Sequence, residues 1–226
     1  MINPIELKKK YLRSREKLFS SLLNSNDGVT FNKNHTILVD SVVKDLVLGI
    51  QRQFPVSDFS LIAVGGYGRQ DLSPKSDVDL LFLYKKSNKN IRGFITALNN
   101  SLWDLGLEVG ISFLTLKQVI IDSKKDIKTV TKFAESRHLI GDEDYYGEFV
   151  RSIKILIGRM NPLKLSEKKL LELVERHDYY LGIKSNLEPQ IKEGIGGLRD
   201  IHTIIWVSIF MFNILKLEDL IQINIF

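Results

Sequence analysis

The sequence contains no cysteine among its 226 residues. Disulfide bonds, thiolate metal sites and cysteine nucleophiles are therefore excluded, and the lack of cysteine suits a reducing cytoplasm, which is the location we expect. Histidine is also scarce, because the chain has four, at positions 35, 138, 177 and 202. Four scattered histidines do not furnish the multi-histidine site of a metal phosphohydrolase. We therefore interpret the His177-Asp178 dipeptide as a coincidence on a helix surface.

No apolar run in the sequence is long enough to cross a membrane. The longest uncharged apolar stretch, Thr203 to Leu215, is shorter than the roughly 20 residues that a spanning helix needs, and we identify no signal peptide. The net charge is modest as well, since 32 basic and 27 acidic residues leave +5 and the basic residues are scattered. We expect neither a membrane nor nucleic acid as a partner. A weak preference for phosphate-bearing partners is the alternative to a plain solvated surface.

What is present is typical of a globular chain with a sizeable core, with 44% hydrophobic and 26% charged residues. Residues 1–56 predict two packing helices joined by a polar loop over 24–34. Residues 57–122 predict a small α/β core, with strands over 59–64, 77–84 and 107–115 and a helix before the third. From residue 116 the pattern is helical, and residues 123–226 are expected to form a helical region. The predicted fold is thus α/β (α+β), with a small mixed sheet between helical segments. Trp103 and Trp206 are expected in the core.

A glycine pair and two aspartates carry the chemistry. The first predicted strand runs into Gly65-Gly66, and after ten intervening residues Asp77 and Asp79 stand at the start of a buried strand. Side chains at i and i+2 of a strand share a face, so two carboxylates converge there, at a cost in free energy that a divalent cation removes. Glycines let the backbone approach a phosphate closely. Alone, the glycines would indicate a tight turn and the aspartates an exposed face, but together they predict a metal-assisted phosphate site, in which two metals could clamp the attacking and leaving oxygens.

These residues also carry a family resemblance. The spacing from Gly65-Gly66 to Asp77-Val78-Asp79-Leu80 resembles the signature of the DNA polymerase β-type nucleotidyltransferase superfamily. The longer run GGYGRQDLSPKSDVDLLFL (65–83) is similar to one branch, the bifunctional PII uridylyltransferase/uridylyl-removing enzymes. The runs LWDLGLEVG (102–110), ESRHLIGDEDYY (135–146) and LEPQIKEGIGGLRDI (187–201) fit the same branch.

The resemblance implies roles for individual residues. Asp77 and Asp79 would hold Mg²⁺ (or Mn²⁺), and Gly65 and Gly66 would cradle the triphosphate of UTP. The superfamily has a third catalytic carboxylate on a later strand, and Glu108 matches its pattern, although an edge-strand glutamate is an equal interpretation. Further candidates for nucleotide contacts are four cations and a hydroxyl: Arg69, Lys75, Ser76, Lys192 and Arg199. The alternatives are solvated loop cations at 69 and 75, and at 192–199 a capped helix start in which Asp200 satisfies the first turn.

The activity implied is transfer of UMP from UTP to a tyrosine of the nitrogen-regulatory PII protein. The sequence departs from the family after Gly110, because Ile111-Ser112-Phe113-Leu114 stands where the family usually has His-Ser-Val-Arg. Two other interpretations are an adenylyltransferase acting on another protein or small molecule, and a non-catalytic truncated remnant that only binds nucleotide. We interpret the apolar end of the sequence as a cut through a longer protein that would carry C-terminal phosphohydrolase and regulatory domains. This chain is therefore expected at most to add UMP.

Overall fold

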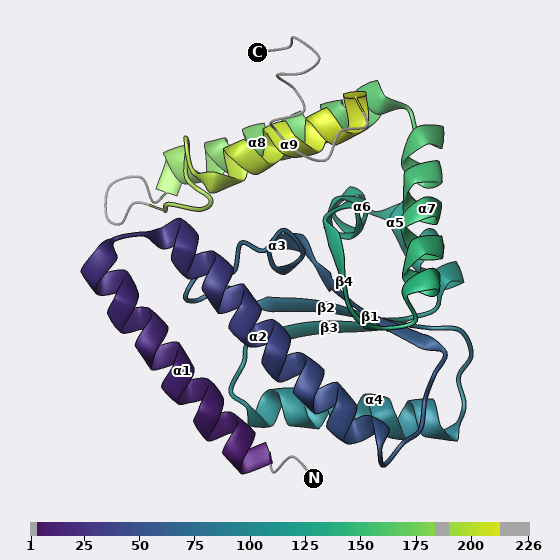
Figure 1. Cartoon of the computed structure of the whole chain (residues 1–226). Coiled ribbons are helices and arrows are strands. Elements are labelled where there is room, and N and C mark those ends of the chain that lie inside the picture. The colour runs from purple at the N-terminus through teal and green to yellow at the C-terminus, as the bar shows by residue number, and fades with distance from the viewer. Residues whose placement is uncertain (1–3, 184–189, 213–226) are drawn as a thin grey trace. The chain divides into compact units, whose positions relative to one another are not determined.

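The computed structural model describes residues 4–183 and 190–212. Figure 1 labels the helices and strands along the chain, and these residues divide into two compact units. The first contains residues up to 122 together with 132–151, and the second contains 123–131 and the residues from 152 onward.

The first unit is built on a mixed sheet, for which the described residues supply four strands: β1 (Phe59–Val64), β2 (Val78–Tyr84), β3 (Val109–Leu114) and β4 (Ser136–Gly141). The strand order is β3-β2-β1-β4, with β1 antiparallel to β2 and β4, and β2 parallel to β3. The predicted fold class is therefore confirmed. The expected helical pattern from residue 116 is wrong for β4, because this strand joins the sheet by pairing with β1 and carries polar residues instead of an apolar run.

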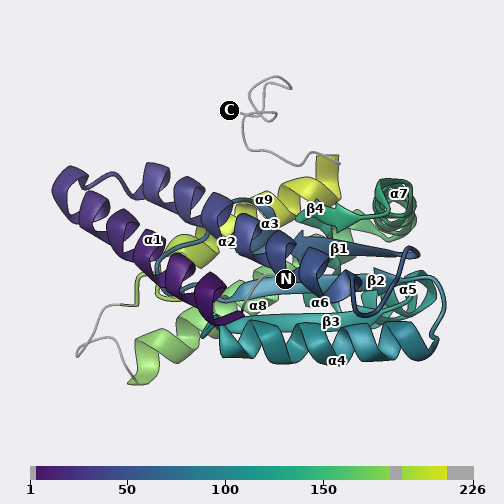
Figure 2. The same ribbon diagram turned by 60° about the horizontal axis from the view of Figure 1, so that its bottom comes forward.

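Three long helices belong to the same unit: α1 (Pro4–Ser25), α2 (Gly28–Gln51) and α4 (Lys89–Asp104). They share one apolar core with residues of β1 and β2 such as Leu61 and Phe82, and α4 runs alongside β3 in Figure 2. The loop expected over 24–34 is reduced to two residues, because the Asp27 carboxylate accepts a hydrogen bond from the backbone N–H of Thr30 (3.0 Å) and caps α2.

The remaining helices are a single turn, α3 (Gly65–Gly68), and five longer ones: α5 (Leu116–Lys125), α6 (Ile127–Ala134), α7 (Glu143–Arg159), α8 (Pro162–Ile183) and α9 (Leu198–Phe212). In the second unit α8 packs against α9. Trp206 of α9 is 6% exposed, which confirms its place in the core. The same expectation is wrong for Trp103, which is 68% exposed, because Leu102 takes the inward position in the last turn of α4.

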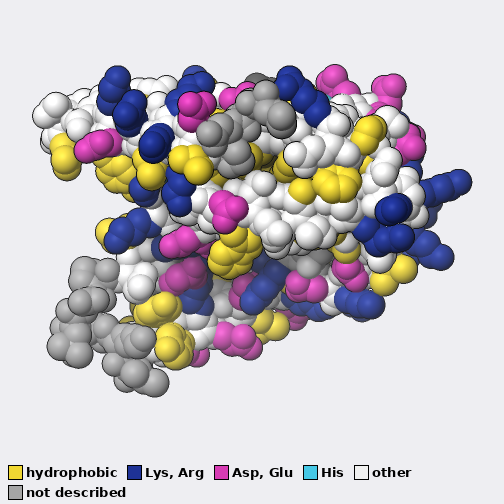
Figure 3. Space-filling view, turned by 90° about the horizontal axis from the view of Figure 1, so that it is seen from below, with side chains coloured by type: hydrophobic (Ala, Val, Ile, Leu, Met, Phe, Trp, Pro, Cys, Tyr) yellow, Lys and Arg dark blue, Asp and Glu magenta, His cyan; other side chains and the backbone are white. Residues whose placement is uncertain are grey.

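The surface has no single charged face in the view of Figure 3, where basic and acidic side chains are interspersed. Within the described residues, no helix is both long and apolar enough to cross a membrane.

Candidate functional site

The turn that follows β1 depends on glycine at two positions. Gly65 has φ +59°, in the left-handed region that favours glycine. A Cβ on Gly68 would lie 2.1 Å from the carbonyl oxygen of Glu135, so the turn packs too closely against the chain entering β4 for any side chain. At Gly66 the nearest atoms to such a Cβ are 3.7 Å away. The local sequence therefore specifies a close turn, with Gly65 needed for the backbone angle and Gly68 for packing.

Tyr67 fastens this turn to the body of the unit. Its side chain is 1% exposed, and its hydroxyl donates a hydrogen bond to the Asp40 carboxylate of α2 (2.6 Å). Arg137 of β4 donates two hydrogen bonds to the same carboxylate (2.7 and 3.0 Å). Burial, followed by the charge of Asp40, raises the pKa of the Tyr67 phenol well above its ordinary value. The turn is thus held from two elements that are distant in sequence.

Asp79 lies on the sheet face that is turned away from the core with α2 and α4, because Val78, Leu80 and Phe82 alternate into that core. The predicted strand over 77–84 begins one residue later, at Val78, so Asp77 directly precedes β2. The Asp79 side chain is 33% exposed, and Asp77 is exposed. A Cβ on Gly65 would be 3.6 Å from Oδ2 of Asp79. The structure therefore brings Asp79 beside the glycine turn.

The neighbouring strand β3 has a glycine where it passes the Asp79 side chain. The backbone N–H of Val78 donates to the carbonyl of Glu108 (2.7 Å), and Asp79 lies opposite Gly110 in the parallel register. A Cβ on Gly110 would approach Oδ1 of Asp79 to 2.8 Å, so glycine is required there. Strand alternation places Glu108 on the face of Gly110, two residues earlier and exposed.

The departure from the family pattern falls mainly on the other face of β3. Ile111 and Phe113 pack against the core cluster, whereas Ser112 and Leu114 alternate to the Asp79 side. The position at which the family usually has histidine is therefore occupied by an apolar residue that faces the core.

The Asp79 carboxylate forms an ion pair with a lysine, Lys132, that the sequence did not predict as part of the site. Lys132 lies in the last turn of α6, and its Nζ is 2.8 Å from Oδ1 of Asp79, with 35% of the lysine side chain exposed. Its Cγ would be 4.0 Å from a Cβ on Gly65, so the lysine stem lies along the glycine turn. The two residues of this ion pair are 53 positions apart, and the local sequence pattern around Lys132 does not predict the contact.

The other predicted phosphate contacts near this turn have different surroundings. Arg69 forms an ion pair with Glu135, whose side chain is 6% exposed, and a guanidinium nitrogen of Arg69 lies 3.7 Å from a Cβ placed on Gly66. Lys75 is exposed. The Ser76 hydroxyl accepts a hydrogen bond from the backbone N–H of Ser73 (3.1 Å) and so closes the turn before β2.

The donor set suits a hard divalent cation. Within residues 4–183 and 190–212, no three acidic or histidine side chains are placed to share a metal ion. Mg²⁺, however, typically takes only one or two carboxylates and completes its shell with water and substrate phosphates. Asp79 and the exposed Asp77, two residues earlier, supply two carboxylates, and glycine at 65 and 110 gives the Asp79 carboxylate room in its present position. The residues present therefore fit such an ion, with Asp77 and Asp79 as the groups that would hold it.

The second predicted contact region, 192–199, is a closed turn in the second unit. Arg199 pairs with Glu193 (2.8 Å), and the hydrogen bond from Arg199 lowers the pKa of Glu193. Lys192 is exposed. Residues 187–189 of the family-like run lie outside the described residues.

Asp200 fastens this closed turn to α8. It accepts hydrogen bonds from Arg176 (2.7 Å), His177 (3.0 Å) and the backbone N–H of Gly196 (2.8 Å). Burial alone would raise the pKa of Asp200, but the hydrogen bonds from His177 and Arg176 outweigh it and leave the pKa below its usual value. His177 therefore has a structural partner in Asp200, and these contacts match the capped-helix interpretation.

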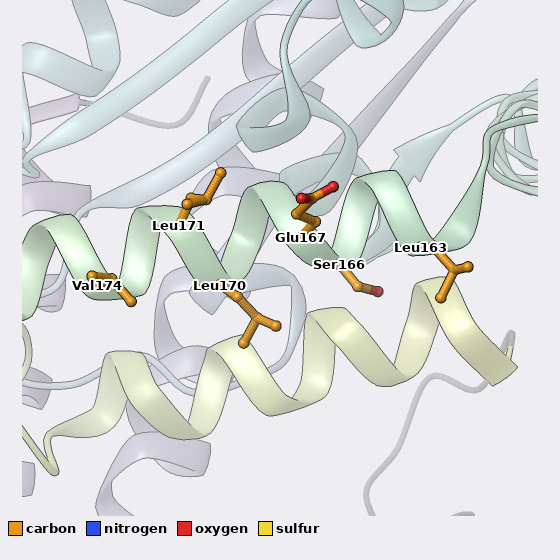
Figure 4. A pocket seen from close by; sticks show the side chains of 6 residues that line it. All are labelled: Leu163, Ser166, Glu167, Leu170, Leu171 and Val174. Atoms are coloured by element: carbon orange, nitrogen blue, oxygen red, sulfur yellow. The ribbon is translucent and has the colours of Figure 1, made fainter.

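A hollow of about 430 Å³ lies on α8 (Figure 4). It is lined by four apolar side chains, a serine and a glutamate: Leu163, Leu170, Leu171, Val174, Ser166 and Glu167. None of the predicted site residues lines it, so it is a separate feature from the carboxylates.

Two families of known proteins match the segments that contain the glycine turn with its aspartates and the turn at 193–197. Residues 43–141 match the family described as nucleotidyltransferase domain, and residues 164–226 match the family described as GlnD PII-uridylyltransferase. A bifunctional uridylyltransferase/uridylyl-removing enzyme of Chromobacterium violaceum is 34% identical over 86% of this chain and 22% of its own length. A protein of the same name from Haemophilus influenzae is 37% identical over 77% of this chain and 20% of its own length.

The chain thus spans about a fifth of the length of these curated relatives. A crystal structure described as a toxin-antitoxin with AMP-PNP covers 58% of the chain at 14% identity, but its TM-score of 0.36 is too low for inference. The matched segments include both the glycine turn with its aspartates and the turn at 193–197. The chain therefore belongs to the family of bifunctional uridylyltransferase/uridylyl-removing enzymes and contains a nucleotidyltransferase domain.

Proposed function

We propose that this chain transfers UMP from UTP to a tyrosine hydroxyl of a PII signal protein. The observation that carries the proposal is the placement of Asp79 between Gly65 and Gly110, beside a turn whose first two residues, Gly65 and Gly66, carry no side chain of their own. The nucleotidyltransferase family match supports the nucleotidyl chemistry, and the match to the GlnD PII-uridylyltransferase family supports PII as the acceptor.

In the proposed reaction the acceptor oxygen forms a bond to the α-phosphorus of UTP. The bond from that phosphorus to the bridging oxygen breaks, and pyrophosphate leaves with the electron pair. In this scheme the hydroxyl proton passes to Glu108, the exposed residue two positions before Gly110. A divalent cation, Mg²⁺ or Mn²⁺, would neutralise charge on the triphosphate when bound.

The chain's own residues bind and orient the nucleotide in this scheme. Asp77 and Asp79 hold the cation, and the backbone of Gly65 and Gly66 faces the phosphates. Arg69 lies beside Gly66 and is held there by its ion pair with Glu135, so that its positive charge would attract the phosphates. Lys75 and Ser76, in the turn before β2, remain proposed nucleotide contacts, as do Lys192 and Arg199.

The experiment that tests this function is incubation with UTP, Mg²⁺ and a purified PII protein, followed by intact-mass analysis of PII. A mass gain of one UMP is expected with the wild-type chain and not with Asp77→Asn or Asp79→Asn. Asp104→Asn, an exposed aspartate at the end of α4, is the matched control and is expected to transfer like wild type. Wild-type rates in Asp77→Asn and Asp79→Asn would contradict the assignment. Parallel incubations with ATP and CTP test an adenylyltransferase or another nucleotide preference.

A second candidate function is nucleotide binding without transfer. The Lys132–Asp79 ion pair favours it, because a resident ammonium occupies a carboxylate that the reaction needs for a metal. Retained UTP binding with no modified PII at any Mg²⁺ or Mn²⁺ concentration would select this candidate over the transferase.

A further inference from the structure

Two cations flank the glycine turn, and their surroundings differ. Arg69 is paired with Glu135, and these side chains are 22% and 6% exposed, so this pair is largely buried. Lys132 is paired with Asp79, and both of these side chains are about one-third exposed (35% and 33%). A buried pair is costly to break, whereas a solvated pair of this kind changes an equilibrium by less than about fivefold. Arg69 is therefore the fixed cation of the turn, and Lys132 is the exchangeable one.

The position of Lys132 coincides with that proposed for the metal. Its ammonium lies 2.8 Å from Oδ1 of Asp79, which is one of the two carboxylates that would hold a divalent ion. A second cation at the same oxygen would be repelled by the ammonium and would have to displace it. The described residues include no ion pair for Asp77, so the competition falls on Asp79 alone.

The aliphatic part of the Lys132 side chain also lies beside Gly65, where the phosphates are expected to bind. Lys132 Cγ lies 4.0 Å from the point where a Cβ of Gly65 would stand, so a rotation of its flexible stem moves the ammonium over the glycine turn. An anionic phosphate chain on that turn would offer the displaced ammonium new partners through charge-assisted hydrogen bonds.

We propose that Lys132 is a stand-in cation for the metal site: it holds Asp79 when no divalent ion is bound and passes to the phosphate chain when the ion arrives with it. Lys132 thereby disfavours binding of a free divalent ion and favours binding of an ion together with a polyphosphate. The second half of this proposal rests on the proposed function, because it assumes phosphates on the glycine turn, whereas the first half concerns the ion alone.

The test is Mn²⁺ binding followed by electron paramagnetic resonance, with and without inorganic tripolyphosphate. Without tripolyphosphate, Lys132→Gln is expected to bind Mn²⁺ about 2- to 5-fold more tightly than wild type, because a competing positive charge is removed. Lys128→Gln is the matched control: it carries the same charge change one turn earlier on α6, at a side chain that is 70% exposed, and should bind Mn²⁺ like wild type. With Mn²⁺ present, Lys132→Gln is expected to bind tripolyphosphate at least about fivefold more weakly.

Each outcome decides a part of the proposal. Unchanged Mn²⁺ affinity in both Lys132→Gln and Lys132→Met, measured on protein whose circular dichroism shows it to be folded, would overturn the competition. Tighter Mn²⁺ binding with unchanged tripolyphosphate affinity would overturn the transfer of the ammonium to phosphate. A chain that follows the expected pattern yet modifies no PII with UTP would support Lys132 as the stand-in cation and contradict the proposed function.

Discussion

Replacing Gly110 with alanine is expected to disturb the Asp79 carboxylate while leaving the sheet folded. The new Cβ would lie 2.8 Å from Oδ1 of Asp79, and that carboxylate is the rotatable, one-third exposed end of its side chain. An off-rotamer aspartate costs about 0.5–1.5 kcal/mol, and alanine in place of a strand glycine returns about 0.5–1 kcal/mol. The free energy of unfolding should therefore change by less than about 1 kcal/mol. The carboxylate, however, must leave its position beside Gly65.

Gly68 is the matched comparison, because the same substitution there meets backbone atoms. A Cβ on Gly68 would lie 2.1 Å from the carbonyl oxygen of Glu135 and 3.0 Å from that of Ala63. Neither oxygen can rotate away, because both belong to the backbone at the paired strands β1 and β4. We expect Gly68→Ala to lower the free energy of unfolding by about 2–3 kcal/mol or more.

Urea unfolding and Mn²⁺ binding together separate the two effects. Gly110→Ala should unfold near the wild-type midpoint and bind Mn²⁺ about tenfold more weakly, in the range found when groups that orient metal ligands are lost. Unaltered Mn²⁺ affinity in Gly110→Ala would refute the inference that Asp79 must stay in place. A urea midpoint as low as that of Gly68→Ala would refute the distinction between a yielding carboxylate and a rigid backbone.

The remaining predictions concern other parts of the chain. Asp40→Ala should lower the free energy of unfolding by roughly 2–3 kcal/mol in urea titrations, because Tyr67 and Arg137 lose their shared, largely buried partner; a loss below 0.5 kcal/mol would contradict this. Burial lowers the pKa of His35 in the folded chain, so stability should be complete above about pH 6.5 and fall as the pH drops through the folded pKa, with a smaller slope in His35→Leu; equal slopes would count against it. Arg199→Ala should weaken UTP binding per folded molecule, as measured by calorimetry, more than it weakens the fold, whereas destabilisation with unchanged binding would make Arg199 purely structural.

The sequence predicted those parts of the site that depend on local pattern. An apolar strand ending at Gly65, and two aspartates at i and i+2 of the next strand, define their own geometry within about 20 residues. Strand alternation was also sufficient to place Asp79 on the face away from the core. The same kind of signal predicted β1, β2 and β3.

The parts that sequence reasoning missed depend on contacts between distant residues. Lys132 meets Asp79 across 53 positions, and Arg137 meets Asp40 across 97. The residues around Lys132, in the last turn of the short helix α6, do not indicate that its partner is a carboxylate on a strand. The need for glycine at 110 arises likewise from the pairing of β3 with β2, which one sequence does not specify. β4 was missed for the same reason, since its place in the sheet is set by β1.

The position of β4 bears on how this protein can be shortened for experiments. A fragment that stops at residue 122 would retain every carboxylate of the candidate site, but it would lack the strand that pairs with the second edge of β1. The residues of β1, FSLIAV, are 0–1% exposed in the whole chain and contain neither a charge nor a proline. An open edge of that composition invites pairing between molecules. Such a fragment is expected to aggregate, and a boundary beyond residue 151, where the first unit is complete, keeps the edge of β1 covered.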